Sequence, residues 1–131
     1  MRYLADTHIL IWAQNQPDRL PPRLAHLIGD PLHDVYFSPV SLWEIAIKFG
    51  LGKLDLLGHT PEHFADGVRE SGMRCLTVMN QVYASSYRLP RRHNDPFDRL
   101  LFWQAIREGV TLLTVDPAAE LYRQDGLVIL R

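Results

Sequence analysis

Residues Arg91–Glu108, RRHNDPFDRLLFWQAIRE, decide how this chain folds and where its chemistry lies. Pro96 has a fixed φ and no N–H, so it suits the first turn of a helix, and Asp95 before it can accept the free N–H groups of that turn. Apolar residues then recur at helical spacing as far as Gly109, which predicts a helix with one buried face. Asp95 and Asp98 therefore lie at the positive end of a helix dipole.

Helix capping alone can explain these two acids. In this interpretation, Asp95 is the N-cap and Asp98 is the acidic partner of a capping box, and both serve only to form the helix. Caps are commoner than active sites, so the pair does not define a site by itself. The positions of the other acids in the chain decide between the two interpretations.

The composition indicates one globular domain. The chain has 131 residues, 47% hydrophobic and 22% charged, which is enough for a core and excludes a disordered protein. Its single cysteine, Cys75, excludes an internal disulfide, suits a reducing cytosol, and lies in an apolar segment that predicts a buried thiol. The formal net charge of −1 means that nucleic-acid binding would need a local basic patch or a metal ion.

The start of the chain argues against export. Asp6 and His8 interrupt the segment that would be the apolar part of a signal peptide, so we expect no such peptide. No apolar run approaches the roughly 20 residues needed to span a bilayer. A cytoplasmic protein is therefore expected.

Short β-forming segments alternate with helical segments along the whole chain. The expected strands are residues 3–5, 34–37, 74–78, 110–115 and 127–130, and the expected helices are 9–13, 22–29, 39–50, 61–71, 81–89, 95–109 and 118–122. No repeat, linker or low-complexity segment divides the chain. Strands alternating with helices predict one three-layer α/β/α sandwich over residues 1–131, with a central, mostly parallel sheet.

Three acidic side chains lie where ligands gather in such a fold, outside the carboxyl ends of the strands, and the position of a fourth is left open. Asp6 follows the first expected strand, Asp116 follows strand 110–115, and Glu44 lies in the helix after the second strand. Asp98 begins the helix that leads into strand 110–115, and simple alternation allows that turn to lie at either edge of the sheet. If it lies at the same edge, four carboxylates face one cleft.

Carboxylates within a few ångströms of one another repel unless a cation joins them. Oxygen ligands suit Mg²⁺ or Mn²⁺, and the chain has no Cys/His cluster of the kind that binds zinc. A metal ion held by carboxylates lowers the pKa of water and stabilises charge on phosphate oxygens. The acids therefore predict a metal-dependent phosphodiesterase.

Four segments resemble, in the right order, the PIN domain, and more closely the VapC-type toxin ribonucleases of bacterial toxin–antitoxin pairs. They are Tyr3–His8 with Trp12, Ser38–Ile45, Asp95–Leu101 and Leu112–Asp116. The resemblance extends over nearly the whole chain. It implies a Mg²⁺- or Mn²⁺-dependent endoribonuclease that acts as a toxin, commonly forms a homodimer, and binds a small VapB-like antitoxin that blocks its site.

The resemblance also assigns roles to individual residues. Four acids would bind the metal ion and serve catalysis: Asp6, Glu44, Asp98 and, as a more variable fourth, Asp116. Asp95 would be an accessory acid, and Thr7 a hydroxyl that orients a carboxylate or a water on the metal. Every acid position is filled, so nothing suggests an inactive copy.

Each of these acids also has a structural interpretation. Asp6 and Asp116 could be a helix cap and a turn residue. Glu44 is harder to explain in this way, because its neighbours Trp43 and Ile45 look inward-facing, and a buried acid needs a partner or a metal.

Basic side chains near the acids could hold RNA phosphates or be solvated charge, and the first is slightly favoured. They are Arg91, Arg92, Arg99, Lys48 and Lys53. His8 and His93 are expected to be structural or surface residues rather than acid–base groups. Nearby aromatic residues are expected in the core or on a dimer surface rather than stacked on bases: Trp12, Trp43, Phe97, Phe102 and Trp103.

Two other functions remain open from the sequence. Another metal-dependent phosphoesterase, such as a DNA nuclease or a phosphatase, would use the same acids. A non-catalytic module would use the acidic pocket to receive a basic peptide, and it need not bind a metal ion.

Overall fold

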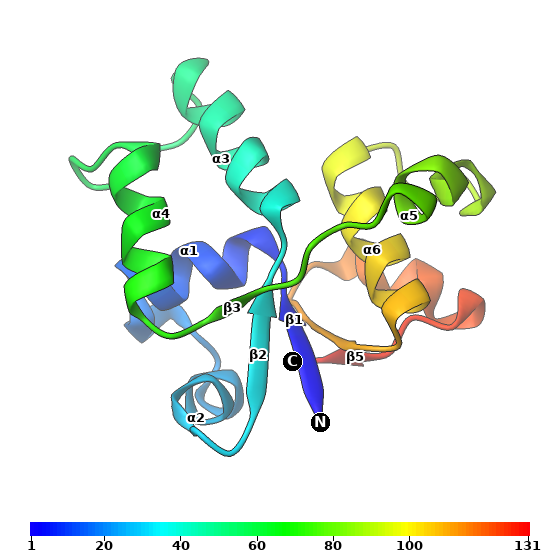
Figure 1. Cartoon of the computed structure of the whole chain (residues 1–131), viewed down its shortest axis with the longest axis horizontal. Coiled ribbons are helices and arrows are strands. Elements are labelled where there is room, and N and C mark those ends of the chain that lie inside the picture. The colour runs from blue at the N-terminus through cyan, green and yellow to red at the C-terminus, as the bar shows by residue number, and fades with distance from the viewer.

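Five parallel strands form the centre of the computed structural model, which describes residues 1–131 (Figure 1). They are β1 (Arg2–Ala5), β2 (Asp34–Phe37), β3 (Arg74–Cys75), β4 (Thr111–Leu113) and β5 (Ile129–Leu130). Their order across the sheet is β3-β2-β1-β4-β5. The chain moves outward from β1 to β3 and then returns to the other side of β1, so the strand order reverses between β1 and β4. Ligands bind at such a switch point, outside the carboxyl ends of the strands.

Helices connect the strands and cover the sheet. The α-helices are α1 (Thr7–Asn15), α2 (Pro22–Gly29), α3 (Pro39–Gly50), α4 (Pro61–Glu70), α5 (Asn80–Ser85) and α6 (Pro96–Glu108), and the 3₁₀ segments are η1 (Pro17–Arg19), η2 (Ser86–Arg88) and η3 (Pro117–Asp125). Proline stands in the first turn of α2, α3, α4 and α6, where its missing N–H costs no hydrogen bond. None of these helices combines the length and the apolar character needed to cross a membrane.

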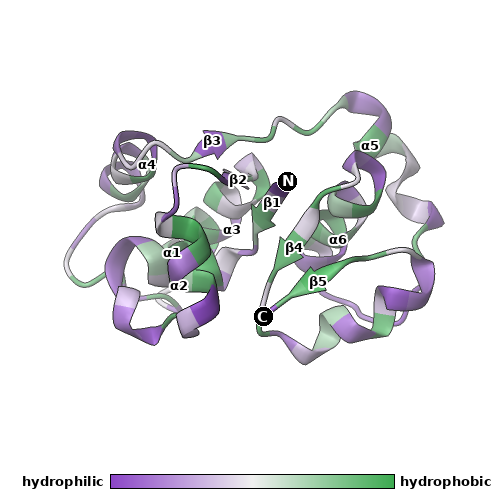
Figure 2. Cartoon of the chain, turned by 90° about the horizontal axis from the view of Figure 1, so that it is seen from below, coloured by the Kyte–Doolittle hydropathy of each residue, from purple (hydrophilic) through white to green (hydrophobic).

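Alternate residues of β1 pack on opposite faces of the sheet. Tyr3 and Ala5 lie in a buried cluster with residues of α1 and α2, whereas Leu4 lies in a cluster with residues of α5, α6 and η3. Adjacent β4 residues divide in the same way, because side chains alternate along a strand: Leu113 joins the first cluster and Leu112 the second. Figure 2 shows the hydrophobic strands β4 and β5 between more polar outer helices. The prediction of a three-layer α/β/α fold with a parallel sheet is confirmed.

The strand boundaries differ most from the prediction at the edge of the sheet. The strand predicted at 74–78 contains only Arg74–Cys75, and the chain beyond it runs irregularly over the core, where Leu76 and Val78 are still buried. The prediction of a buried thiol is wrong, because Cys75 lies on the outermost strand and is exposed.

Two of the predicted helices differ from the structure in extent or type. The helix predicted at 81–89 divides into α5 and the 3₁₀ turn η2, and the short helix predicted at 118–122 is the 3₁₀ segment η3. The helix around Asp95 and Pro96 begins and ends as predicted, with Gly109 in the left-handed conformation (φ 67°) at its end.

Candidate metal centre

Asp6 lies at the switch point of the sheet. Its N–H donates to the carbonyl of Leu113 at 3.0 Å, which extends the pairing of β1 with β4 by one residue. Its Oδ1 accepts from the N–H of Ile9 at 2.8 Å, so Asp6 is also the N-cap of α1. The residue is 6% exposed, and burial raises the pKa of its carboxyl to about 6, although a hydrogen bond with the Thr114 side chain and the Ile9 N–H lower it.

Glu44 is almost completely buried in α3 and has a partner on each carboxylate oxygen. Its Oε1 accepts from the hydroxyl of Thr7 at 2.7 Å, and Thr7 Oγ1 lies 3.0 Å from the hydroxyl of Ser41. Its Oε2 pairs with the ammonium of Lys48, one turn further along α3. Burial alone would lower the pKa of Lys48, but the hydrogen bond and the charge of Glu44 raise it. Thr7 thus lies where it can orient a carboxylate, as the family resemblance implies.

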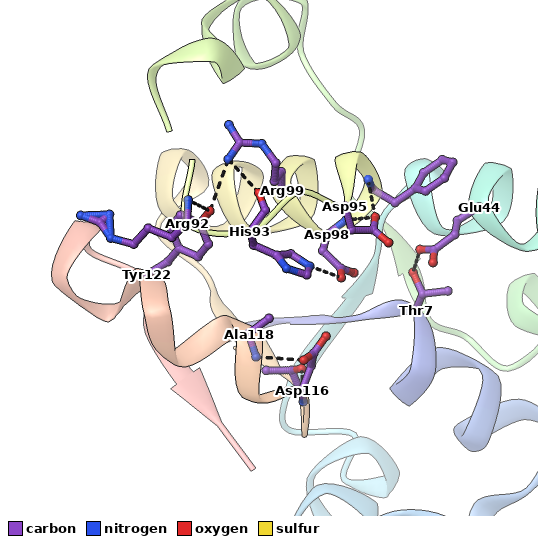
Figure 3. Close-up of polar contacts among 12 residues, drawn as sticks. Thr7, Glu44, Arg92, His93, Asp95, Asp98, Arg99, Asp116, Ala118 and Tyr122 are labelled. Carbon is purple, nitrogen blue, oxygen red and sulfur yellow. Dashed lines mark hydrogen bonds and ion pairs between the residues drawn. The ribbon is translucent and has the colours of Figure 1, made fainter. Parts of the chain in front are cut away.

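Asp95 and Asp98 begin α6 but play different parts (Figure 3). Oδ1 of Asp95 accepts from the N–H groups of Phe97 and Asp98, at 2.8 Å and 3.1 Å, so Asp95 is the predicted N-cap. Asp98 does not complete a capping box; its Oδ2 lies 2.9 Å from Nε2 of His93. Burial raises the pKa of Asp98, and the negative charges of Asp95, Glu44 and Asp116 raise it further, whereas the hydrogen bond from His93 lowers it.

Asp116 follows β4 and begins η3. Its Oδ1 accepts from the N–H of Ala118 at 2.9 Å, and its own N–H donates to the hydroxyl of Thr114 at 3.0 Å. The residue is half-buried, and its negative charge acts on Asp98. Figure 3 shows its side chain below that of Asp98, whereas Glu44 lies to the right.

The acids meet at one edge of the sheet. One carboxylate oxygen from each of Glu44, Asp95 and Asp98 lies within 4.8 Å of the other two. The charges of Asp6 and Asp116 also couple to Asp98. The start of α6 therefore lies at the same edge as the ends of β1 and β4, the arrangement that alternation alone left open. The three acids whose oxygens lie within 4.8 Å of one another include Asp95 and not Asp6. The family resemblance implies the reverse, with Asp6 as a metal ligand and Asp95 as an accessory acid.

These residues fit a hard divalent cation. Opposite ligands of Mg²⁺ lie about 4.2 Å apart, twice the usual metal–oxygen distance, so oxygens within 4.8 Å of one another can share an ion after small side-chain movements. Capping does not compete with this use, because Asp95 caps with Oδ1 and keeps Oδ2. Asp98 likewise keeps Oδ1, since His93 contacts Oδ2. The structural and the metal-binding interpretations are therefore compatible.

Several basic side chains predicted to face RNA are used within the protein. Arg99 donates to backbone carbonyls of the 89–93 segment, Arg92 pairs with Asp125 at 3.2 Å, and Lys48 pairs with Glu44. Arg99 and Lys48 are therefore paired within the chain rather than simply solvated, and their contact with RNA phosphates stays a prediction.

Arg91, by contrast, is exposed and lines a cavity of about 500 Å³ together with Trp43 and Phe97. Trp43 is 63% exposed, so the expectation that it faces inward beside Glu44 is wrong. Its ring lies edge-on to that of Phe97, with centroids 5.4 Å apart.

Comparison with known proteins agrees with this architecture. The family model described as "PIN domain" matches residues 3–126, and the chain belongs to that family. The family's members are nucleases, so the chain is assigned to the nucleases as a class. A sequence-level comparison with curated proteins finds no match.

Three solved structures of VapBC proteins share the fold. A DNA-bound VapBC from Salmonella typhimurium is 17% identical with a TM-score of 0.69, covering 99% of this chain and 97% of the other. VapBC2 from Rickettsia felis, bound to a DNA fragment from the promoter, is 20% identical with a TM-score of 0.66, covering 99% and 98%. VapBC-1 from nontypeable Haemophilus influenzae is 19% identical with a TM-score of 0.63, covering 99% and 97%.

Lys48 offers a test of the charge balance in this centre. Lys48→Met should lower the free energy of unfolding of the metal-free protein by about 1–3 kcal/mol, because it leaves the buried Glu44 with an unpaired oxygen. The same change should tighten Mn²⁺ binding, since it removes a competing cation. Chemical denaturation in EDTA and calorimetric titration with Mn²⁺ measure the two effects, and Lys53→Met, at an exposed position, is the matched control. Unchanged stability in EDTA would show that the pair with Lys48 does not support Glu44.

Proposed function

We propose that this chain is a Mg²⁺- or Mn²⁺-dependent endoribonuclease and the toxin of a toxin–antitoxin pair. The observation that carries the proposal is the convergence of Glu44, Asp95 and Asp98 within 4.8 Å, with Asp6 and Asp116 beside them, at the switch point of the sheet. A divalent ion bound there would lower the pKa of water and stabilise the charge that develops on phosphate oxygens. We propose Asp6, Glu44, Asp98 and Asp116 as its ligands, with Asp95 as a further oxygen donor.

Hydrogen bonds within the chain fix the orientation of the carboxylates proposed to bind the ion. The Thr7 hydroxyl holds one oxygen of Glu44, and backbone N–H groups hold one oxygen each of Asp6, Asp95 and Asp116. Carboxylates fixed in this way lose little freedom when they bind an ion, which strengthens binding. The hydrogen bonds to Asp6, Asp95 and Asp116 come from backbone at helix starts, so they form whenever the sheet and helices form.

The proposed partners follow from the fold and from the exposed surface. The solved VapBC structures support a VapB-like antitoxin as partner. We propose the cytoplasm as the place of action. Trp43, Tyr83 and Tyr87 are each at least half exposed and border the cavity between α3, α5 and α6. Exposed apolar surface of this kind is typical of protein contacts, and it supports a homodimer.

The direct test compares three substrates under three metal conditions. The purified chain is incubated with structured RNA, single-stranded DNA and a small phosphate ester, in Mg²⁺, in Mn²⁺ and in EDTA. We expect internal cleavage of RNA with either metal ion and none in EDTA. Faster cleavage of DNA would instead identify a DNA nuclease, and hydrolysis of the ester alone a phosphatase. Absence of both Mn²⁺ binding and cleavage would leave the acidic pocket as a receptor for basic peptides.

A further inference from the structure

The segment that brings His93 to Asp98 has no helix or strand of its own. It runs from the end of η2 to the start of α6, and residues 90, 91, 92 and 94 are exposed. A segment with few backbone hydrogen bonds and much exposed surface opens easily unless other contacts hold it. The position of this segment determines where His93 lies, and the segment ends at Asp95.

The side chain of Arg99, one turn into α6, holds the backbone of this segment. Its Nη2 donates to the carbonyl of Leu89 at 2.9 Å, and its Nη1 donates to the carbonyl of Pro90 at 3.0 Å. Nη1 also lies 3.3 Å from the carbonyl of His93. A guanidinium can serve several carbonyls at once because its donors are fixed in one plane, which a lysine ammonium does not reproduce.

The hydroxyl of Tyr122, from η3, holds the same segment from the other side. Tyr122 is completely buried, and its hydroxyl donates to the carbonyl of Pro90 at 2.9 Å. The same oxygen accepts from the N–H of Arg92 at 3.1 Å and lies 3.3 Å from Nη1 of Arg99. Figure 3 shows the contacts of Tyr122 with Arg92 and Arg99 and that of Arg99 with the carbonyl of His93, whose ring points toward Asp98.

We propose that Arg99 and Tyr122 are positioning residues for the metal centre. They hold the backbone before His93 and the carbonyl of His93 itself, so that its ring keeps Oδ2 of Asp98 in place and leaves Oδ1 for the ion. The side chains of both residues contact this segment rather than a carboxylate of the centre, so both act through His93. The inference rests on the proposed function, since it takes Asp98 to be a ligand.

The test uses the smallest changes that break these contacts. Tyr122→Phe removes the hydroxyl but keeps the ring that packs on Phe102, and Arg99→Lys keeps the charge but loses the planar set of donors. Tyr36→Phe and Arg107→Lys are the matched controls, because Tyr36 lies on β2 and Arg107 in the last turn of α6, both away from this segment. For each full-length variant, Mn²⁺ affinity is measured by calorimetry, the melting temperature by circular dichroism, and RNA cleavage as a function of Mn²⁺ concentration.

We expect both variants to bind Mn²⁺ about 10- to 100-fold more weakly than the controls, the usual effect of losing a group that orients a metal ligand. Cleavage should return to within a few-fold of the wild-type rate at high Mn²⁺, with an unchanged KM for RNA. All assays are run far below the melting temperature of each variant, where the protein is folded. Under these conditions, recovery of cleavage at high Mn²⁺ indicates weakened metal binding rather than a general loss of folded protein.

Two results would overturn the inference. Unchanged Mn²⁺ affinity with a raised KM for RNA in Arg99→Lys alone would make Arg99 a direct phosphate contact. A reduced number of binding sites per molecule, with normal affinity at the remaining sites, would make the two residues merely structural. If the wild-type chain bound Mn²⁺ but cut no RNA, the proposed function would fail, while the calorimetric comparison would still decide whether Arg99 and Tyr122 position Asp98.

Discussion

Asp98→Asn is expected to lower metal-dependent RNA cleavage by about 1,000-fold or more, a loss of about 4 kcal/mol of transition-state stabilisation. Asparagine has the same shape but no negative charge, so the centre loses an anionic ligand between Glu44 and Asp116. The fold should remain intact, because an amide oxygen can still accept the hydrogen bond from His93. Initial rates of RNA cleavage in Mn²⁺, measured beside circular dichroism spectra, check both statements.

The control for this variant is Asp66→Asn, which removes an exposed carboxylate of α4 that pairs only with Arg69. It should cleave RNA at the wild-type rate. Asp98→Asn should also unfold no more easily than the wild type in EDTA, since burial and neighbouring charges already raise the pKa of Asp98. Cleavage by Asp98→Asn within tenfold of the wild-type rate would remove Asp98 from the proposed mechanism.

Asp6→Asn should make the metal-free protein more stable while it abolishes the response to metal. Burial raises the pKa of Asp6 from 3.8 to about 6, so the folded state disfavours the ionised carboxylate. Metal-free stability therefore falls as pH rises from about 4 to about 6 and stays low above that range. Asparagine carries no charge and its oxygen can still accept from the Ile9 N–H, so we expect up to about 3 kcal/mol of stabilisation at pH 7.5 in EDTA.

Saturating Mn²⁺ should reverse this order. An ion at 1,000 times its dissociation constant stabilises a folded protein by about 4.1 kcal/mol, which exceeds the advantage of Asp6→Asn in EDTA, and only the wild type should receive that contribution. Chemical denaturation of both proteins, in EDTA and in Mn²⁺ at pH 7.5, measures all four stabilities. If Asp6→Asn were less stable than the wild type in EDTA, the Asp6 carboxylate would have a structural role. If Mn²⁺ stabilised both proteins equally, the ion would bind elsewhere.

Much of this centre follows from local sequence patterns. An acid directly after a strand, or before a proline that begins a helix, can be located from neighbouring residues alone, and Asp6, Asp95 and Asp116 all lie where such patterns place them. The edge at which α6 begins was not predictable, because it depends on how the irregular chain after β3 and the helix α5 return to the sheet. Strand ends were also uncertain, since the edge strand β3 pairs over only two residues.

The partners of the acids were mostly beyond sequence reasoning, with one exception. Lys48 lies four residues after Glu44, the helical spacing of ion pairs, so that contact had a local signal. The buried residues of α3, Val40, Ser41, Glu44 and Ile45, likewise define a face that excludes Trp43, as helical spacing alone indicates. The contact between Arg99 and Tyr122 joins α6 to η3 across 23 residues, and no local pattern marks it.

The metal centre is tested most directly by anomalous diffraction from a crystal of the protein soaked in Mn²⁺. We expect a manganese peak at the carboxyl edge of the sheet, about 2.0–2.3 Å from oxygens of Glu44 and Asp98, with oxygens of Asp6, Asp95 or Asp116 bonded directly or through water. A fully occupied manganese site elsewhere in the molecule, with Glu44 still paired to Lys48 and no peak between Glu44 and Asp98, would contradict it.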